Sequence, residues 1–144
     1  MPAIQTTYTT NISKARAGFV ADMTQCDLIS RTVENAGGIP FGFPVAQGAN
    51  DKGAIPFAGT KYLGFAVRER STNIGEQFSQ YESARVLIKG PIWVNASVAV
   101  AARDPVYLTA AGLVTNASSG NTLVPGATFS SSTTGAALAE IFIK

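Results

Sequence analysis

The stretch from Arg85 to Thr115 decides the fold: it reads RVLIKGPIWV (85–94), SVAVAARDPVYL (97–108) and AAGLVT (110–115). Short apolar and β-branched runs alternate here with Gly-Pro, Asp-Pro and Ala-Gly steps, which end strands and begin turns. In the first run, Gly90-Pro91 marks a bulge or an edge, and one face carries Val86, Ile88, Ile92 and Val94. The stretch therefore predicts several short β-strands of one small domain.

Strand patterns continue on both sides of this stretch. Residues 62–67 alternate as a half-buried strand should, and further strands are predicted at 28–33, 98–101, 106–109, 113–115, 123–129 and 136–143. Proline in the repeated triplets Ile39-Pro40-Phe41 and Ile55-Pro56-Phe57 removes a backbone donor, so these are strand edges or entries. The spacing of roughly 8 to 12 residues is typical of a sandwich or barrel. We predict an all-β fold, a β-sandwich or β-barrel (jelly-roll-like) of short antiparallel strands.

The 144 residues are enough for a single domain with its own core. We expect one β domain over residues 17–144, preceded by an extended N-terminal arm over residues 1–16. The arm is rich in Thr and carries an apolar residue at every fourth place, Ile4, Tyr8 and Ile12. The alternatives to an extended arm are a disordered terminus and a single strand that docks on the domain. Residues 14–23 could hold a short helical turn or a strand.

Composition limits the classes of partner. Only 14% of residues are charged while 46% are hydrophobic, and such a surface favours assembly with copies or partners. The net charge is +2 with scattered basic residues, so direct nucleic-acid binding is disfavoured, and Arg68-Glu69-Arg70 is interpreted as a solvated strand end. No secretory signal or membrane-length apolar run occurs in the sequence, and Cys26 is the single cysteine. We expect a soluble protein made in the cytosol, with no membrane partner.

The sequence contains few of the residues and motifs that common enzyme mechanisms use. There is no histidine, so histidine-based triads and the commonest metal ligand are absent, and Cys26 is interpreted as a small buried hydrophobe. No glycine-rich phosphate loop or bunched set of acids occurs, so we expect no cofactor, no metal and no enzyme activity. A carboxylate pair acting on glycosides stays open as the weakest hypothesis. Trp93, Tyr107, Tyr62 and Phe65 could stack sugars, although core or subunit interface is the favoured role.

Several segments carry a resemblance to a known family. They are AIQTTYTTNISKARAGFVADM (3–23), ISRTVENAGGIPFGFPVAQG (29–48), KGPIWVNASVAVAARDPVYL (89–108), NTLVPGATF (121–129) and AALAEIFIK (136–144). In this order they resemble the structural cement, or decoration, proteins of tailed-bacteriophage heads, nearly from end to end. The resemblance implies a structural virion protein that binds the outer surface of the expanded head, cements neighbouring major capsid protein subunits and acts as a homodimer or homotrimer.

For the contacts with capsid or sister subunits, we expect the arm and the long connection after residue 70 to supply side chains. The expected residues are Ile4, Tyr8, Ile12, Lys14, Arg16, Phe78 and Tyr81. Disorder of the arm and local packing of the two aromatics are the competing interpretations. The alternative function is a phage tail-associated or adhesion module that binds carbohydrate through an aromatic β-sheet face.

Overall fold

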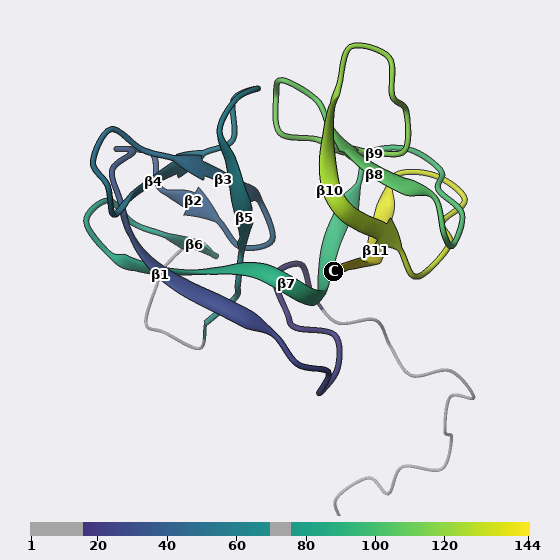
Figure 1. Ribbon diagram of the computed structural model, residues 1–144, viewed down its shortest axis with the longest axis horizontal. Coiled ribbons are helices and arrows are strands. Elements are labelled where there is room, and N and C mark those ends of the chain that lie inside the picture. The colour runs from purple at the N-terminus through teal and green to yellow at the C-terminus, as the bar shows by residue number, and fades with distance from the viewer. Residues whose placement is uncertain (1–15, 70–75) are drawn as a thin grey trace, which may run out of the picture.

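The computed structural model describes residues 16–69 and 76–144, and within these ranges every regular element is a β-strand (Figure 1). In chain order these are β1 (Asp27–Val33), β2 (Ile39–Pro40), β3 (Pro44–Gln47), β4 (Gly53–Pro56), β5 (Tyr62–Ala66), β6 (Gln77–Phe78), β7 (Ser83–Ala96), β8 (Pro105–Leu108), β9 (Val114–Thr115), β10 (Thr122–Phe129) and β11 (Ala137–Ile143). The predicted all-β class is confirmed.

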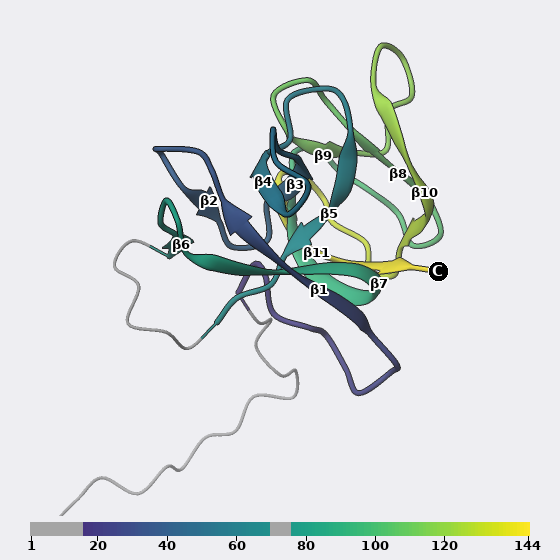
Figure 2. The same ribbon diagram turned by 60° about the vertical axis from the view of Figure 1, so that its left-hand side comes forward.

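The strands close into two circuits that share β7. Nine of them form a continuous sheet in the order β1-β4-β3-β5-β7-β11-β10-β8-β9, and the additional pairings β1–β7 and β7–β9 close it on both sides. Figure 1 shows the result as two lobes with β7 running through both, and Figure 2 shows the same strand crossing β1. Two pairings, β1–β4 and β7–β9, are parallel. Between the predicted sandwich and barrel, strand closure favours the barrel, which leaves few exposed edges.

The shared strand β7 changes partners at Gly90. Its first half pairs with β1 and β5, and its second half pairs with β11 from Gly90 to Ala96. Gly90 has a φ of 122°, and a Cβ at this position would lie 2.7 Å from the Cys26 Sγ atom. Glycine is therefore required both for the backbone conformation and for the close approach of the preceding segment. The predicted bulge or edge at Gly90-Pro91 is confirmed only as a local irregularity: β7 continues through both residues, and the register shift of its pairing with β1 falls at Ile88.

Two hydrophobic clusters fill the molecule. The first lobe encloses Val33, Ile39, Phe41, Val45, Ala54, Ala66, Phe78, Ala84 and Val86. The larger cluster fills the second lobe, including Ile92 and Val94 of β7, and reaches the back of the first lobe through Phe65 and Leu87. Because one strand and one cluster belong to both lobes, we expect residues 17–144 to unfold as a single unit.

The strand β5 departs from the predicted alternation. A register shift opposite Val45 and Ala46 leaves Leu63 without a pairing partner, as in a β-bulge. The bulge turns Tyr62 toward Phe65, and their ring centroids are 5.8 Å apart. The predicted strand at residues 62–67 is confirmed as β5. Its predicted half-burial is wrong, because the larger cluster covers the face that carries Phe65 and Val67.

The remaining differences concern short elements. The Pro-containing triplets behave as predicted: β2 pairs only with β6 in a separate two-stranded sheet, and β4 ends at Pro56. The predicted strand at 98–101 is reduced to one bridge between Val100 and Thr133. The strand β3 was not predicted, since it is four residues long and begins with Pro44. Its pairing with both β4 and β5 comes from tertiary contacts that local sequence does not encode.

We predict that Gly90→Ala destabilises the whole protein by at least about 2 kcal/mol, because the substitution adds both backbone strain and a clash with Cys26. Urea unfolding should be followed by Trp93 fluorescence and by far-ultraviolet circular dichroism, and both midpoints should fall together. Gly120→Ala is the matched control, since Gly120 also has a positive φ of 71° but nothing lies within 4 Å of its Cβ position. Separate midpoints for the two signals would show that the lobes unfold independently.

Tyr62 carries a second prediction. Its side chain is partly buried, and its hydroxyl oxygen is buried without a hydrogen-bond partner among the described residues. Burial raises the pKa of this phenol. An unpaired buried hydroxyl opposes folding, so Tyr62→Phe should increase the free energy of unfolding by up to about 1 kcal/mol. The half-buried Tyr107 provides the control Tyr107→Phe. A clear loss of stability in Tyr62→Phe alone would mean that the hydroxyl is satisfied in solution.

Candidate functional site

The described residues contain no assembled metal or thiolate centre. Within residues 16–69 and 76–144, no three His, Cys, Asp or Glu side chains lie close enough to hold a metal ion. Cys26 is half-buried against the larger cluster, and its Sγ donates a hydrogen bond to the Thr24 carbonyl oxygen at 3.1 Å. Burial first, and then the nearby Asp22 and Asp27, raise the pKa of this thiol, which keeps it protonated and weakly nucleophilic.

The part of the chain that the structure describes contains no helix long and apolar enough to cross a membrane.

The most organised surface feature is the segment Ala17–Ala21, which joins the expected arm to the barrels; we call it the arm root. It lies along the second half of β7: the Gly18 amide donates to the Trp93 carbonyl at 2.7 Å and the Trp93 amide donates to the Phe19 carbonyl at 2.9 Å. Val20 forms a bridge with Ile92. Both conformations left open for residues 14–23 occur in the described part: residues 16–19 form a turn closed by the hydrogen bond from the Phe19 amide to the Arg16 carbonyl at 3.2 Å, and Val20 is strand-like.

The guanidinium of Arg68 holds the arm root from the other side. Its Nε donates to the Ala17 carbonyl oxygen at 3.0 Å, and its Cζ lies 5.0 Å from the ring centroid of Phe41 and 5.6 Å from that of Phe19. Only 12% of the Arg68 side chain is exposed, so these cation–π contacts are partly desolvated and stronger than exposed ones. The prediction that residues 68–70 form a solvated strand end is wrong for Arg68, because two aromatic rings cover it.

Glu76 links Arg68 to the end of the expected arm. Its carboxylate lies 3.3 Å from an Arg68 nitrogen and 3.0 Å from the Arg16 Nη1 atom. The hydrogen bond and charge of Arg68, followed by the charge of Arg16, lower the pKa of Glu76 from the ordinary value of 4.5. Its contribution is therefore present above pH 4.5 and is lost as the pH falls through the lowered pKa. Because Arg16 and Glu76 are exposed, their pair contributes little by itself.

The residues expected to make contacts fall into three groups. Ile4, Tyr8, Ile12 and Lys14 lie outside the described residues. Arg16 is exposed directly before the arm root and reaches Glu76, just before β6. Phe78 was expected in a contact, but it is 1% exposed and packs edge-to-face on Phe41 with ring centroids 5.0 Å apart. That expectation is corrected: β6 turns Phe78 into the first lobe's cluster, where it cannot reach a partner.

Tyr81 is exposed, as a contact with a partner would require, and the expected contact itself stays a prediction. Its side chain is 77% exposed in the turn between β6 and β7, and its amide donates to the Val33 carbonyl at 2.8 Å. Its φ of 68° is uncommon for a residue with a bulky side chain. The turn therefore holds a large aromatic ring toward solvent at a cost in backbone strain, and such positions are concentrated at functional surfaces.

The structure does not assemble the aromatic platform that carbohydrate binding would need. Phe65 is fully buried and Tyr62 packs against it inside the larger cluster. Trp93 of β7, whose backbone pairs with the arm root, and Tyr107 of β8 are each half-buried.

Sequence reasoning did not identify the other exposed apolar side chains as candidates. They are Phe19, Met23, Leu28, Val98, Leu113 and Leu123, with exposed fractions between 36% and 102%. Leu123 lies in β10 directly opposite Tyr107 of β8, so these two form an apolar spot on the outside of the second lobe. Both alternate with buried neighbours, and this alternation was the available signal.

Comparison with known proteins gives two matches and one negative result. The model of the structural cement protein family (E217 gp24/Pam3 gp6) matches residues 4–144. A chain in the solved structure "The capsid of Myoviridae Phage XM1" superposes with a TM-score of 0.74 and 20% sequence identity, covering 99% of this chain and 98% of that chain. At that identity the superposition establishes a shared fold. A search of curated proteins found no match.

The arm root provides a test of the Arg68 contacts. Arg68→Met removes a hydrogen bond, an ion pair and two cation–π contacts, so we predict that trypsin cleaves after Arg16 about tenfold faster under native conditions. Arg85→Met is the control, because Arg85 makes only a 3.6 Å ion pair with Glu69 and its side chain is 46% exposed. Equal cleavage rates in the two variants would contradict the role given to Arg68.

Proposed function

The chain belongs to the structural cement protein family, and from this premise we propose that it binds the outer surface of an assembled phage head and joins neighbouring major capsid protein subunits. The family assignment makes it a capsid-stabilising structural protein of the virion. The single observation that carries the assignment is the match of the family model to residues 4–144. The proposal includes three further statements: the chain lies on the outer surface of the head, it assembles with other copies of itself, and it is synthesised in the host cytoplasm.

The arm root supports the proposed attachment. Its backbone is joined to β7 by hydrogen bonds at Gly18, Phe19 and Ala21, and Arg68 holds it against the first lobe. A contact made by residues 1–16 would thus be connected directly to the strand that both barrels share. Force on the arm would be spread over several backbone hydrogen bonds of a closed sheet, as a shell-stabilising protein requires.

Tyr81 and the apolar spot of Leu123 and Tyr107 offer further contact points on different parts of the surface. Exposed aromatic side chains are the residues that most often dominate interface energetics. A protein that touches several capsid subunits at once gains from multivalency, because each first contact raises the effective concentration of the next. Modest individual contacts therefore suffice for durable attachment.

We also propose that the protein acts as a homodimer or homotrimer, which is supported by its low charge content and by the exposed Leu113 and Leu123 of the second lobe. The partners are then the major capsid protein and further copies of this chain, without direct nucleic-acid or membrane contact. No observation favours the carbohydrate-binding alternative, since Phe65 is in the core and the partly buried Tyr62 packs against it.

The test is co-sedimentation of the purified protein with expanded heads that lack their decoration protein. We predict saturation at a fixed ratio to the major capsid protein and a higher melting temperature of the decorated shell. Removal of residues 1–15 should leave a folded protein with at least tenfold weaker binding. Binding that never saturates would contradict the proposed function, and unchanged affinity of the truncated protein would contradict the role of the arm.

Within the same assay, Tyr81→Asn tests the exposed ring without disturbing the turn, because Asn tolerates a positive φ. We expect it to weaken binding several-fold. Lys61→Asn is the matched control: Lys61 also has a positive φ, of 56°, and is exposed in another turn of the first lobe. Equal affinities of the two variants would remove Tyr81 from the contact surface.

A further inference from the structure

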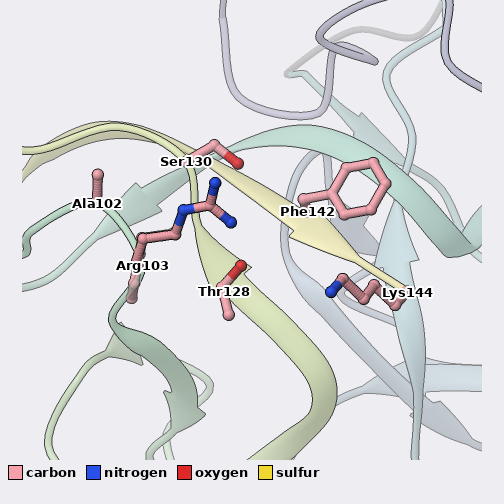
Figure 3. Close-up of a pocket in the computed structure, with 7 residues that line it drawn as sticks. Ala102, Arg103, Thr128, Ser130, Phe142 and Lys144 are labelled. Atoms are coloured by element: carbon pink, nitrogen blue, oxygen red, sulfur yellow. The ribbon is translucent and has the colours of Figure 1, made fainter.

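A pocket of about 180 Å³ lies on the second lobe where β10 and β11 meet the turn before β8. Figure 3 shows the guanidinium of Arg103 beside the hydroxyls of Thr128 and Ser130, with the ring of Phe142 across from them and the amine of Lys144 at the same opening. The pocket thus combines two cations, two hydroxyl groups and one apolar wall. This set of groups can receive a negatively charged oxygen and the carbon chain that carries it.

The backbone of β10 fixes both cationic residues. The Arg103 amide donates to the Phe129 carbonyl at 2.7 Å, and the Lys144 amide donates to the Gly126 carbonyl at 3.1 Å. Gly126 has a φ of 71° within the irregular part of β10, and this turn of the chain directs its carbonyl toward Lys144. Two residues that are 41 positions apart in sequence are therefore placed at one pocket by the same strand.

Arg103 adopts a conformation that disfavours its side chain. Its φ is 80°, in a region where glycine or asparagine causes less backbone strain than arginine. The turn is closed by the hydrogen bond from the Asp104 amide to the Ala101 carbonyl at 3.1 Å. Strain of this kind is often kept where the side chain has a function. Arg103 is therefore a candidate for a binding role and not merely a turn residue.

The two cations of the pocket, Arg103 and Lys144, have no acidic side-chain partner among the described residues. The adjacent Asp104 carboxylate instead accepts hydrogen bonds from the Asn116 Nδ2 at 2.7 Å and the Ala101 amide at 2.9 Å. These bonds lower the pKa of Asp104. The neighbouring acid is thus committed elsewhere, and the two cations are left to face solvent.

We propose that this pocket binds the carboxylate of an acidic side chain, Asp or Glu, on the capsid protein to which the chain attaches. The proposal rests on the proposed function for the source of the carboxylate. The volume suits a single side chain, since pockets for small-molecule ligands usually measure 300–1,000 Å³. Arg103 supplies a planar pair of donors that matches a carboxylate, and Lys144 adds a second charge.

A polypeptide partner agrees with the surroundings of the pocket. A neighbouring pocket of about 320 Å³ shares Phe142 and Lys144 with the first and also includes Lys89 and Asp27. An extended segment can therefore place its acidic side chain beside Arg103 and continue across Phe142 into the second pocket. The few cations form no stripe of the kind that follows a nucleic-acid backbone.

The first test uses the double variant Arg103→Asn/Lys144→Gln in the shell-binding assay. Asparagine retains the positive φ at position 103, so the fold is expected to persist. The matched control is Lys61→Asn/Lys52→Gln, which removes the same charge from exposed positions of the other lobe and also replaces a residue of positive φ. We expect at least a tenfold loss of affinity and a weaker salt dependence for the pocket variant, and less than a twofold change for the control. Equal affinity of the pocket variant and the wild-type protein would overturn the proposal while the cement function stands.

The second test needs no shell. Amide signals of the isotope-labelled wild-type protein are followed by NMR during titration with N-acetyl-L-glutamate, with N-acetyl-L-glutamine as the neutral probe. Saturable shifts at Arg103, Ser130 and Lys144 with the acid alone, absent from the double variant, would support the pocket even if wild-type protein failed to bind shells. The absence of saturable shifts, or tighter binding of a single-stranded oligonucleotide at these residues, would overturn it.

Discussion

The structure depends on one strand being part of two barrels. The fourteen residues of β7 pair with β1 and β5 in the first lobe and with β11 and β9 in the second. This is possible because Gly90 adopts a φ of 122° where the partners change, and because no side chain at that point collides with Cys26. Leu87 and Val86 are both fully buried because each faces one of the two clusters, whereas Arg85 and Lys89 of the same strand stay exposed.

The same strand organises the outer surface. The arm root adds backbone hydrogen bonds along its second half, so the end of the expected arm lies at the junction of the lobes. On the far side, β11 pairs with β7 and carries Phe142, while β10 holds Arg103 and Lys144 through backbone carbonyls. The arm root and the basic pocket are thus connected through paired strands of one sheet, and neither is on a separate appendage.

A cement protein needs a rigid body with several separate contact points, and this architecture provides them. Closed barrels leave few unpaired strand edges that could cause uncontrolled association. The features that reach outward are few and specific: the arm root with Arg16 and Phe19, the strained Tyr81, and the pocket around Arg103. Their separation over the surface is suited to joining neighbouring subunits of a lattice, where affinity arises from the number of contacts engaged together.

The sequence by itself determined the all-β class, the irregular point at Gly90-Pro91, most strands after residue 84 and the family resemblance, because alternation, proline and glycine act through local backbone geometry. It also indicated the exposure of Tyr81. Tertiary structure decided that Phe78 lies in the core, that Arg68 is covered by Phe41 and Phe19, and that the outer face of β5 is buried. It also brought Arg103 and Lys144 to one pocket. In each of these cases the outcome depends on which distant strand packs against the residue, and such pairing is selected by the closure of the two barrels and not by the neighbouring sequence.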